Sequence, residues 1–323
     1  MPEFYETALT EEKSHLNDNM LKSIQRKFKT VANNPKTALI KTLYVLSPLF
    51  SDRAYLKMLF PLKVGYKLDL ANPKTFNEKL QWLKINYRKP EMPRMVDKYE
   101  AKRWAAGIIG KEFIIDTYGV WNSFDEIDFD SLPDSFVLKT THDQGGVVVV
   151  RDKEKWDKEA AKRKLAKHLK RQHYYLTREW PYKNVKPRIL AEALLCDGDK
   201  AQPNDYKFYC FNGRPRILLV ATERSSGNAK FDYFDMEFRP VDLKQGGERS
   251  GRTLAQPLGF RTMIRLAERL ASDLPHVRVD FYDIEGAVYF GEMTFFDGGG
   301  MALFEPQIVD RTWGDWIDLE KVV

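Results

Sequence analysis

The sequence predicts an α+β protein in which antiparallel hairpins pack against helices. Residues 205–222 and 277–295 are rich in β-branched and aromatic residues in the way that strands are. Each run contains a pair ending in glycine, Asn212-Gly213 or Glu285-Gly286, which is typical of a tight turn between two paired strands. Residues 260–273 instead have the residue spacing of a helix. Hairpins and helices mixed along one chain are typical of the α+β class.

The first 90 residues are expected to form a helical extension. Residues 10–60 carry apolar side chains three and four positions apart, with a break at residues 33–35. A clearer helix is expected within residues 72–90, where Thr75 or Asn77 would cap the first turn and Pro90 would end the helix. The composition becomes more strand-like after residue 92.

Composition restricts the class of protein. The chain has 323 residues, 43% of them hydrophobic, which is enough for two or three packed units. Its two cysteines, Cys196 and Cys210, form no CxxC motif and favour neither a disulfide framework nor a thiolate zinc site. No apolar run reaches 18 residues and the first 13 residues are acidic, so we expect no membrane span, no secretory signal and a cytoplasmic location.

The net charge of +6 favours anionic partners such as nucleotides, acidic sugars or nucleic acid. Two basic segments contribute to it, residues 162–172 within an expected long helix at 152–175, and residues 223–230. Such segments are more often solvated faces than binding sites, although a polyanionic sugar would suit either of them.

The C-terminal hairpin carries the strongest chemical signal. Strand alternation places Arg278, Asp280 and Tyr282 on one face of the first strand, and Phe290, Glu292 and Thr294 on one face of the second. Asp280 and Glu292 then become cross-strand neighbours, and two carboxylates so close repel each other unless a cation lies between them. Mg²⁺ accepts such a sparse oxygen site when phosphates complete its octahedron. The alternative is a pair of solvated strand carboxylates.

A second signal lies in the stretch FVLKTTHDQGG, residues 136–146. Its simplest interpretation is a hairpin with a solvated lysine, because a Gly-Gly pair between β-branched runs marks a turn. The alternative is that Lys139 and the backbone amides around Gly145 and Gly146 hold the phosphates of a nucleotide.

Together these motifs resemble the ATP-grasp superfamily. The segments FNEKLQWLK, DKYEAK, FVLKTTHDQGG, DYKFYCFNGRPR, VDFY and GEMTFF further resemble its TupA-like branch, which is associated with teichuronopeptide and capsular polysaccharide biosynthesis. The likeness runs from about residue 70 to residue 305. It implies the ATP-grasp fold, with two α+β subdomains gripping ATP: a helical N-terminal region at 1–90, a lid subdomain with the glycine loop at 91–188, and a C-terminal subdomain with metal carboxylates at 189–323.

The resemblance also implies roles for individual residues, with ATP and Mg²⁺ as cofactors. Lys98 and Lys139 would hold the phosphates from two sides, and Lys207 would also point toward them. Gly145 and Gly146 would form a mobile lid over the phosphates. His142 could also contact a phosphate, although a single loop histidine more often has a structural role. The base and ribose would meet the backbone of Ala191 to Ala193 and the Glu192 side chain. Arg278, with Lys139, would be catalytic, and Asp280, Glu292 and Thr294 would hold the metal. Many ATP-grasp enzymes have Asn at the position of Thr294, so whether one or two Mg²⁺ bind is left open.

The function implied is an ATP-dependent carboxylate-amine ligase, which activates a carboxylate as an acylphosphate and joins it to an amine. The carboxylate would belong to a uronic acid of a surface polysaccharide or its precursor, and the amine to an amino acid, with peripheral contact to membrane-bound polysaccharide machinery. An ATP-grasp kinase acting on a sugar hydroxyl is the nearest alternative. A non-catalytic nucleic-acid-binding protein is the alternative of another class, and the carboxylates Asp280 and Glu292 argue against it.

Overall fold

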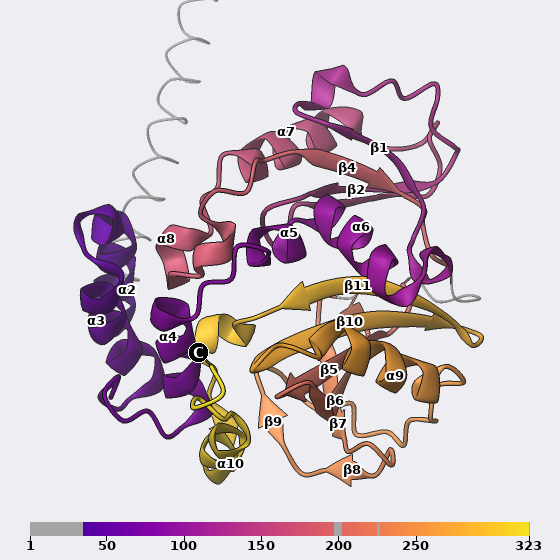
Figure 1. The fold of residues 1–323 in the computed structure, drawn as a ribbon. Helices are drawn as coiled ribbons and strands as arrows, with labels where there is room; N and C mark the ends of the chain where they lie inside the picture. Colours follow the sequence, from indigo (N-terminus) through magenta and orange to yellow (C-terminus); the bar gives the residue numbers. More distant parts are fainter. Residues whose placement is uncertain (1–34, 197–201, 225–226, 323) are drawn as a thin grey trace, which may run out of the picture.

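The structure, a computed structural model, describes residues 35–196, 202–224 and 227–322 of the chain. Within these residues two antiparallel sheets face one cavity, and helices cover their outer faces (Figure 1). The helices are α2 (Pro35–Leu46), α3 (Asp52–Val64), α4 (Phe76–Asn86), α5 (Met92–Val96), α6 (Lys98–Ile109), α7 (Lys158–Leu169), α8 (Tyr174–Thr177), α9 (Phe260–Ala271) and α10 (Ile308–Trp316). Short 3₁₀ turns are η1 (Ser47–Leu49), η2 (Lys111–Phe113), η3 (Phe124–Glu126), η4 (Trp180–Tyr182) and η6 (Asp297–Gly300).

The smaller sheet has the strand order β1-β4-β2-β3, with β1 (Thr117–Trp121), β2 (Phe136–Thr140), β3 (Val147–Val150) and β4 (Ile189–Glu192). Its core packs against α7, where Leu165 meets Phe136 and Leu138 of the central strand. The helix is shorter than the 152–175 expected because Asp157 caps its first turn, accepting a hydrogen bond from the backbone N–H of Ala160 at 2.8 Å.

The larger sheet has the order β11-β10-β5-β6-β7-β8. Its strands are β5 (Asp205–Phe211), β6 (Arg214–Thr222), β7 (Lys230–Phe234), β8 (Pro240–Val241), β10 (His276–Ile284) and β11 (Ala287–Thr294). The two expected turns are confirmed, since Asn212 and Gly213 have φ of 47° and 79°, and Glu285 and Gly286 have φ of 51° and 93°. These positive angles are the ones that a two-residue turn between right-twisted strands requires. A separate pair, β9 (Lys244–Gln245) with β12 (Phe304–Glu305), lies beside the sheet.

The helical character expected of the N-terminal region is confirmed for residues 35–90, while residues 1–34 lie outside the described part. Thr75 is the N-cap of α4 in a capping box with Glu78, and the helix ends at Asn86. Phe76 packs edge-on against Trp313 of α10, with ring centroids 5.4 Å apart. The helix therefore shares the hydrophobic core of the larger sheet.

The strand pairing of β4 bears on the boundary that was expected between the lid subdomain and the C-terminal subdomain. Strand β4 pairs with both β1 and β2, so it belongs to the sheet that carries the glycine loop. A division after residue 188 would separate this central strand from its hydrogen-bonded neighbours. The change from one sheet to the other falls after Glu192, between β4 and β5.

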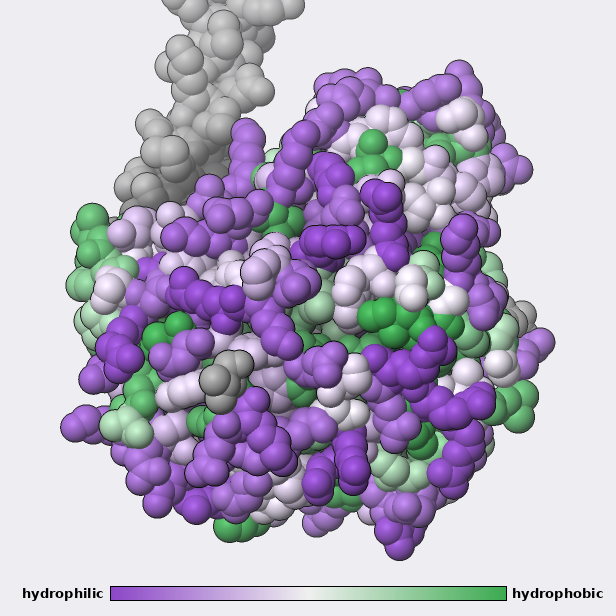
Figure 2. Space-filling view, viewed as in Figure 1, coloured by the Kyte–Doolittle hydropathy of each residue, from purple (hydrophilic) through white to green (hydrophobic). Residues whose placement is uncertain are grey.

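The visible surface is largely hydrophilic, with apolar side chains scattered over it and gathered at the edge formed by α2 and α3 (Figure 2). Leu39, Val45, Leu46 and Leu49 are exposed there. Across residues 35–196, 202–224 and 227–322, no helix has the length and apolar character needed to cross a bilayer.

Candidate active site

A cavity of about 530 Å³ lies between the two sheets. The smaller sheet, the β2–β3 loop and α6 line one end of it, and strands β5, β10 and β11 line the opposite wall. Residues that are far apart in the sequence, such as Lys98 and Asp297, therefore share one space. We describe the cavity as a lysine end, a carboxylate wall and a third end near α8.

The lysine end consists of Lys98, Lys102, Lys139 and Glu192. The Glu192 carboxylate is 4% exposed and lies between two ammonium groups, with Lys102 Nζ 2.5 Å from Oε2 and Lys139 Nζ in contact with Oε1. Lys98 Nζ donates instead to the backbone carbonyl of Asp143 in the glycine loop, at 2.6 Å. Three lysines thus line this end with a single carboxylate among them.

The charges at this end have different environments. Burial works against the charge of Lys139, but Glu192 outweighs it and the pKa of Lys139 is raised. Burial lowers the pKa of Lys102, and the neighbouring Lys139 charge adds to that effect while Glu192 opposes it. Burial alone would raise the pKa of Glu192, yet the two lysines hold it below its ordinary value. At this end, Glu192 thus raises the pKa of one lysine, Lys139, while burial lowers the pKa of the other, Lys102.

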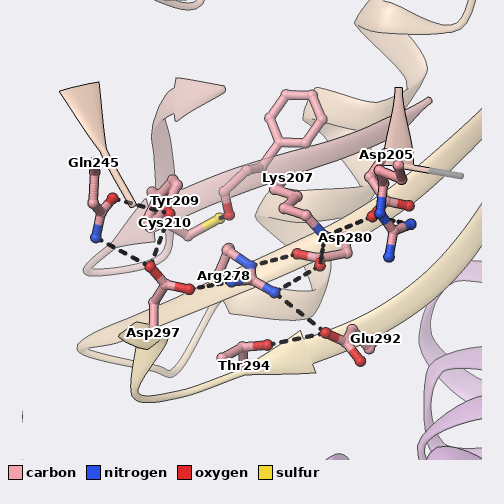
Figure 3. A network of polar contacts seen from close by, with 12 residues as sticks. Asp205, Lys207, Tyr209, Cys210, Gln245, Arg278, Asp280, Glu292, Thr294 and Asp297 are labelled. Carbon is pink, nitrogen blue, oxygen red and sulfur yellow. Dashed lines mark hydrogen bonds and ion pairs between the residues drawn. The ribbon is translucent and has the colours of Figure 1, made fainter. Parts of the chain in front are cut away.

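The carboxylate wall is centred on Arg278 and Asp280 of β10 (Figure 3). Arg278 binds Asp280 with two hydrogen bonds, Nε to Oδ1 at 2.7 Å and Nη2 to Oδ2 at 2.8 Å. The same guanidinium donates to Glu292 Oε1 at 3.2 Å and to Asp297. Lys207 Nζ lies 2.5 Å from Asp280 Oδ2. Burial alone would raise the pKa of Asp280, but Arg278 and Lys207 hold it below its ordinary value.

Two further carboxylates complete this wall. Asp205 lies 2.9 Å from Lys207 Nζ and 2.5 Å from Arg224 Nη1. Asp297 accepts from the Tyr209 hydroxyl at 2.9 Å and from Gln245 Nε2 at 3.2 Å, so both of its oxygens are in hydrogen bonds. Four carboxylates therefore face three cations: Asp205, Asp280, Glu292 and Asp297 against Lys207, Arg224 and Arg278.

The predicted pairing of Asp280 with Glu292 is confirmed by the strand register. The prediction that Phe290 shares the face of Glu292 is wrong, because Gly291 forms a β-bulge that shifts the register between these two residues. Phe290 consequently pairs with Phe281 in the core. A side chain at Gly291 would be crowded, since its Cβ would lie 3.1 Å from the carbonyl oxygen of Asp280.

In the structure, basic side chains offset the repulsion expected between Asp280 and Glu292. The cation between them is the Arg278 guanidinium, and Lys207 adds a second positive charge at Asp280. Removing the Asp280 charge would therefore take one carboxylate partner from each of two buried cations, which is a cost and not a relief. Thr294 lies beside this pair, its hydroxyl 3.5 Å from Glu292 Oε1.

The glycine loop between β2 and β3 contributes Gln144 and Gly145 to the cavity, but not Gly146 or His142. Gly145 has a φ of 83°, and a Cβ at Gly146 would collide with the Thr140 hydroxyl. His142 is buried and donates through Nε2 to the carbonyl of Arg171 at 3.1 Å. Burial lowers the pKa of its imidazole. The structure therefore places His142 in the framework of the loop.

Of the segment expected to meet the adenine base, residues 191–193, only Glu192 and Ala193 line the cavity. Ala191 is buried between β1 and β2, opposite Gly119 and Leu138, and does not reach the cavity. Ala193, Leu194 and Leu195 line the cavity instead, next to Glu192. Strand β4 is central in its sheet, and the backbone N–H of Ala193 just beyond its end donates to the carbonyl of Asp116 at 3.0 Å.

Several cavity residues were not expected from the sequence. Lys102 lies one helical turn after Lys98 in the same motif, so i, i+4 spacing on α6 would have indicated it. Asp205 alternates with Lys207 on β5, which likewise puts both on one face. Asp297 and Arg224 come from loops, and local sequence gives no signal for them.

Two α+β units that supply lysines from one side and a carboxylate-bearing hairpin from the other define the class of ATP-grasp proteins. The family model for TupA-like ATP-grasp proteins matches residues 78–318, and the chain belongs to that family. Membership supports ATP binding and, in general terms, an ATP-dependent ligase.

Solved structures with a similar fold include two D-alanine-D-alanine ligases and the ATP-grasp ligase PsnB. The D-alanine-D-alanine ligase of Helicobacter pylori is 15% identical, with a TM-score of 0.41, covering 78% of this chain and 66% of that one. The Bacillus anthracis D-alanine–D-alanine ligase complexed with ATP is 15% identical, with a TM-score of 0.36 and coverages of 71% and 64%. The ATP-grasp ligase PsnB, complexed with a phosphomimetic minimal precursor, Mg and ADP, is 11% identical, with a TM-score of 0.39 and coverages of 76% and 66%.

The chain thus spans just under two thirds of the length of these structures. No curated protein matches it.

Proposed function

We propose that the protein is an ADP-forming carboxylate-amine ligase. The observation that carries the proposal is the division of charge within one cavity, where a cation-rich end adjoins a carboxylate-rich wall. ATP brings about four negative charges, which need lysines and metal in a cleft of low dielectric. We place its phosphates against Lys98, Lys102, Lys139 and Lys207, with the adenine along Ala193 to Leu195.

The residues present fit a magnesium ion that is shared with phosphates. Asp280 and Glu292 are cross-strand neighbours whose oxygens converge on one cation, Arg278. Among the described residues no three or more acidic, histidine or cysteine side chains form a complete metal cage. Mg²⁺ commonly takes one or two carboxylates and completes its shell with phosphate oxygens and water. Bound there with Thr294 nearby, it would neutralise charge on the transferred phosphoryl group.

Arg278 supplies the group for the chemical step. Its guanidinium lies between Asp280, Glu292 and Asp297, where a metal would compete for the carboxylates and leave the arginine for substrate. A carboxylate attacks the γ-phosphate to give an acylphosphate, and the fixed guanidinium stabilises the oxyanion that forms when an amine attacks the acyl carbon.

The acceptor we propose is a uronic acid of a surface polysaccharide or its precursor, joined to an amino acid. The resemblance to the TupA-like branch implies it, and the net charge of +6 suits an acidic acceptor.

The test is turnover of Mg·ATP with D-glucuronate and D-galacturonate against a panel of amino acids. We expect ADP and phosphate with an amide product detected by mass spectrometry. A phosphoester product would instead identify a kinase, and release of AMP would contradict an acylphosphate route. For variants of the cavity lysines the control is Lys155→Met, because this lysine is exposed and pairs only with neighbouring Asp152 among the described contacts.

A further inference from the structure

The third end of the cavity is not used by the nucleotide or the metal as placed above. It is lined by His173, Thr177 and Glu179 from the region around α8, and by Gly298 and Gly299 of η6. The two segments are more than 100 residues apart in the chain, and both line this end.

A buried carboxylate is the central feature of this end. The Glu179 side chain is 3% exposed, and its Oε1 accepts from Thr177 Oγ1 at 2.7 Å and from His173 Nε2 at 3.2 Å. Burial alone would raise the pKa of Glu179, but His173 and Lys84 hold it below its ordinary value. Both donors among the described residues bond to Oε1, so Oε2 takes no hydrogen bond from them.

A buried lysine, Lys84, joins the segments beside the Glu179 carboxylate, which we call the floor of the third end. Lys84 Nζ donates to the carbonyl oxygens of Thr177 at 2.7 Å and Gly299 at 2.5 Å, and to Gln81 Oε1 at 2.9 Å. It thereby ties α4, α8 and η6 together. All three donor hydrogens are used and the lysine does not line the cavity, so its role is to position the floor.

The glycine turn leaves room that a side chain would fill. Gly298 and Gly299 have φ of 57° and 66°, a left-handed conformation in which a side chain is strained. A Cβ at Gly299 would lie 2.8 Å from Thr177 Cγ2 and 3.7 Å from Glu179 Oε1. The hollow beside Glu179 therefore depends on glycine.

This end also adjoins the reacting part of the cavity. Glu179 lines the same cavity as Arg278 and Glu292. Burial raises the pKa of Tyr182, and the charges of Glu179 and Glu292 raise it further. The Tyr182 ring also packs edge-on against His173, with centroids 5.0 Å apart. A ligand beside Glu179 thus lies next to the wall that carries Arg278.

We propose that the third end binds the amine substrate as its ammonium ion, with Glu179 as the counter-ion and His173 as the acceptor of its proton. This inference rests on the ligase function proposed above. A buried carboxylate attracts an ammonium group and repels the carboxylate and phosphate substrates, so the chemistry of this end suits only the amine. The lysine end and Arg278 suit the anions.

The arrangement of His173 favours a base. Because Nε2 donates to the Glu179 carboxylate, the lone pair of the neutral imidazole lies on Nδ1. The ammonium gives one proton to this nitrogen and becomes a neutral amine. The amine nitrogen then bonds to the acyl carbon, the bond from that carbon to the phosphate oxygen breaks, and the second proton leaves with inorganic phosphate. The histidine returns its proton to water.

Binding can be tested without turnover. Saturation-transfer NMR with glycine, L-alanine, L-lysine and L-glutamate as probes, in the presence of Mg·ADP, should detect at least one of them on the wild type. Glu179→Gln keeps the shape and the acceptor oxygen for Thr177, and it should weaken that binding by about tenfold or more because a charged partner is lost. The control Glu320→Gln, at an exposed carboxylate, should not change it. No signal on the wild type, or equal signals in both variants, would overturn the proposal.

A second experiment separates the two half-reactions. Hydroxylamine, a strong nucleophile that is neutral near pH 7, should trap the acylphosphate of D-glucuronate or D-galacturonate as a hydroxamate. In Glu179→Gln and His173→Gln, hydroxamate formation should stay within about threefold of wild type, whereas amide formation from the amino acid should fall about a hundredfold. Glu179→Gln should mainly raise KM for the amine, and His173→Gln should mainly lower kcat.

These outcomes distinguish a failure of the proposed amine site from a failure of the proposed ligase function. Equal loss of hydroxamate and amide in both variants would make Glu179 and His173 structural or part of the carboxylate site, and would overturn this inference alone. Absence of hydroxamate from the wild type would overturn the ligase function itself, and the amine site with it.

Discussion

The lysine end and the carboxylate wall face the same cavity with opposite balances of charge. Glu192 is outnumbered by the lysines around it, whereas Arg278, Lys207 and Arg224 are outnumbered by carboxylates. Each carboxylate at either place is stabilised by its neighbours, so the difference is not one of stability. An excess of cations attracts phosphate, and an excess of carboxylates attracts a metal or an ammonium. The sign of the excess charge in each part of the cavity is therefore the basis on which we propose its ligand.

The largest expected effect comes from removing one lysine at the lysine end. Lys139→Met should lower ATP turnover by about a thousandfold, because a fixed cation at the developing phosphoryl charge is lost. The fold should survive, since Glu192 keeps Lys102 as its partner at 2.5 Å. Turnover is measured as ADP release, and folding by circular dichroism. If the turnover of Lys139→Met is close to that of the control Lys155→Met, then Lys139 is a solvated hairpin lysine that does not contact phosphate.

An intermediate effect is expected at the carboxylate wall, where two carboxylates differ in burial. Asp280 is 5% exposed and pairs with both Arg278 and Lys207, whereas Glu292 is 38% exposed. Asp280→Asn should therefore lower the free energy of unfolding of the nucleotide-free protein by about 3 kcal/mol, because it breaks a buried network. Glu292→Gln should cost less than about 1 kcal/mol, as expected for an exposed ion pair.

Urea unfolding measures both variants of the carboxylate wall. Mg·ATP should raise the stability of the wild type and have little effect on either variant. Equal losses of stability in the two variants would show that the difference in burial between Asp280 and Glu292 does not affect stability. Stabilisation of both variants by Mg·ATP would show that the metal binds elsewhere.

The smallest effect concerns Lys84, a buried lysine that bonds to carbonyl groups and an amide and has no carboxylate in contact among the described residues. Burial lowers its pKa to about 7, partly offset by Glu179, whereas the carboxylates beside Lys139 and Lys207 raise theirs. Above pH 7 the folded state loses this proton while the unfolded state keeps it up to about pH 10.4. The contribution of Lys84 to stability therefore rises by about 1 kcal/mol per pH unit in this window and is lost as the pH falls through 7.

The Lys84→Met variant tests that slope. Its unfolding free energy, measured by urea unfolding at pH 7.5, 8.5 and 9.5, should rise less steeply than that of the wild type. Parallel curves would mean that Lys84 does not titrate between pH 7.5 and 9.5 in the folded protein.

Much of the fold could be predicted from local pattern. The turns at Asn212-Gly213 and Glu285-Gly286, helix α9 and the cap at Thr75 depend on residues within a few positions of each other. The bulge at Gly291 could not be predicted, because a one-residue shift of register leaves the sequence pattern nearly unchanged while it moves Phe290 to the other face.

The partners of the site residues were harder to predict. Glu192 was expected to meet the ribose or the base, and the structure shows it between two lysines that come from α6 and β2. Asp280 and Glu292 were expected to hold a metal, and the structure shows Arg278 bonded to both of them. The contacts of Glu192 join separate elements, and a single sequence carries no record of which side chains will meet.

What the sequence by itself determined is therefore the local chemistry: a hairpin that brings Asp280 opposite Glu292, a lysine before a glycine loop, and a composition suited to anions. The tertiary structure alone decided which charges share the cavity, including Arg224, Asp297 and the pair His173 and Glu179. The physical reason is range. Backbone preferences and strand alternation act over a few residues, whereas Coulomb interactions in a buried cleft act between groups that only the folding of distant segments brings within a few ångströms.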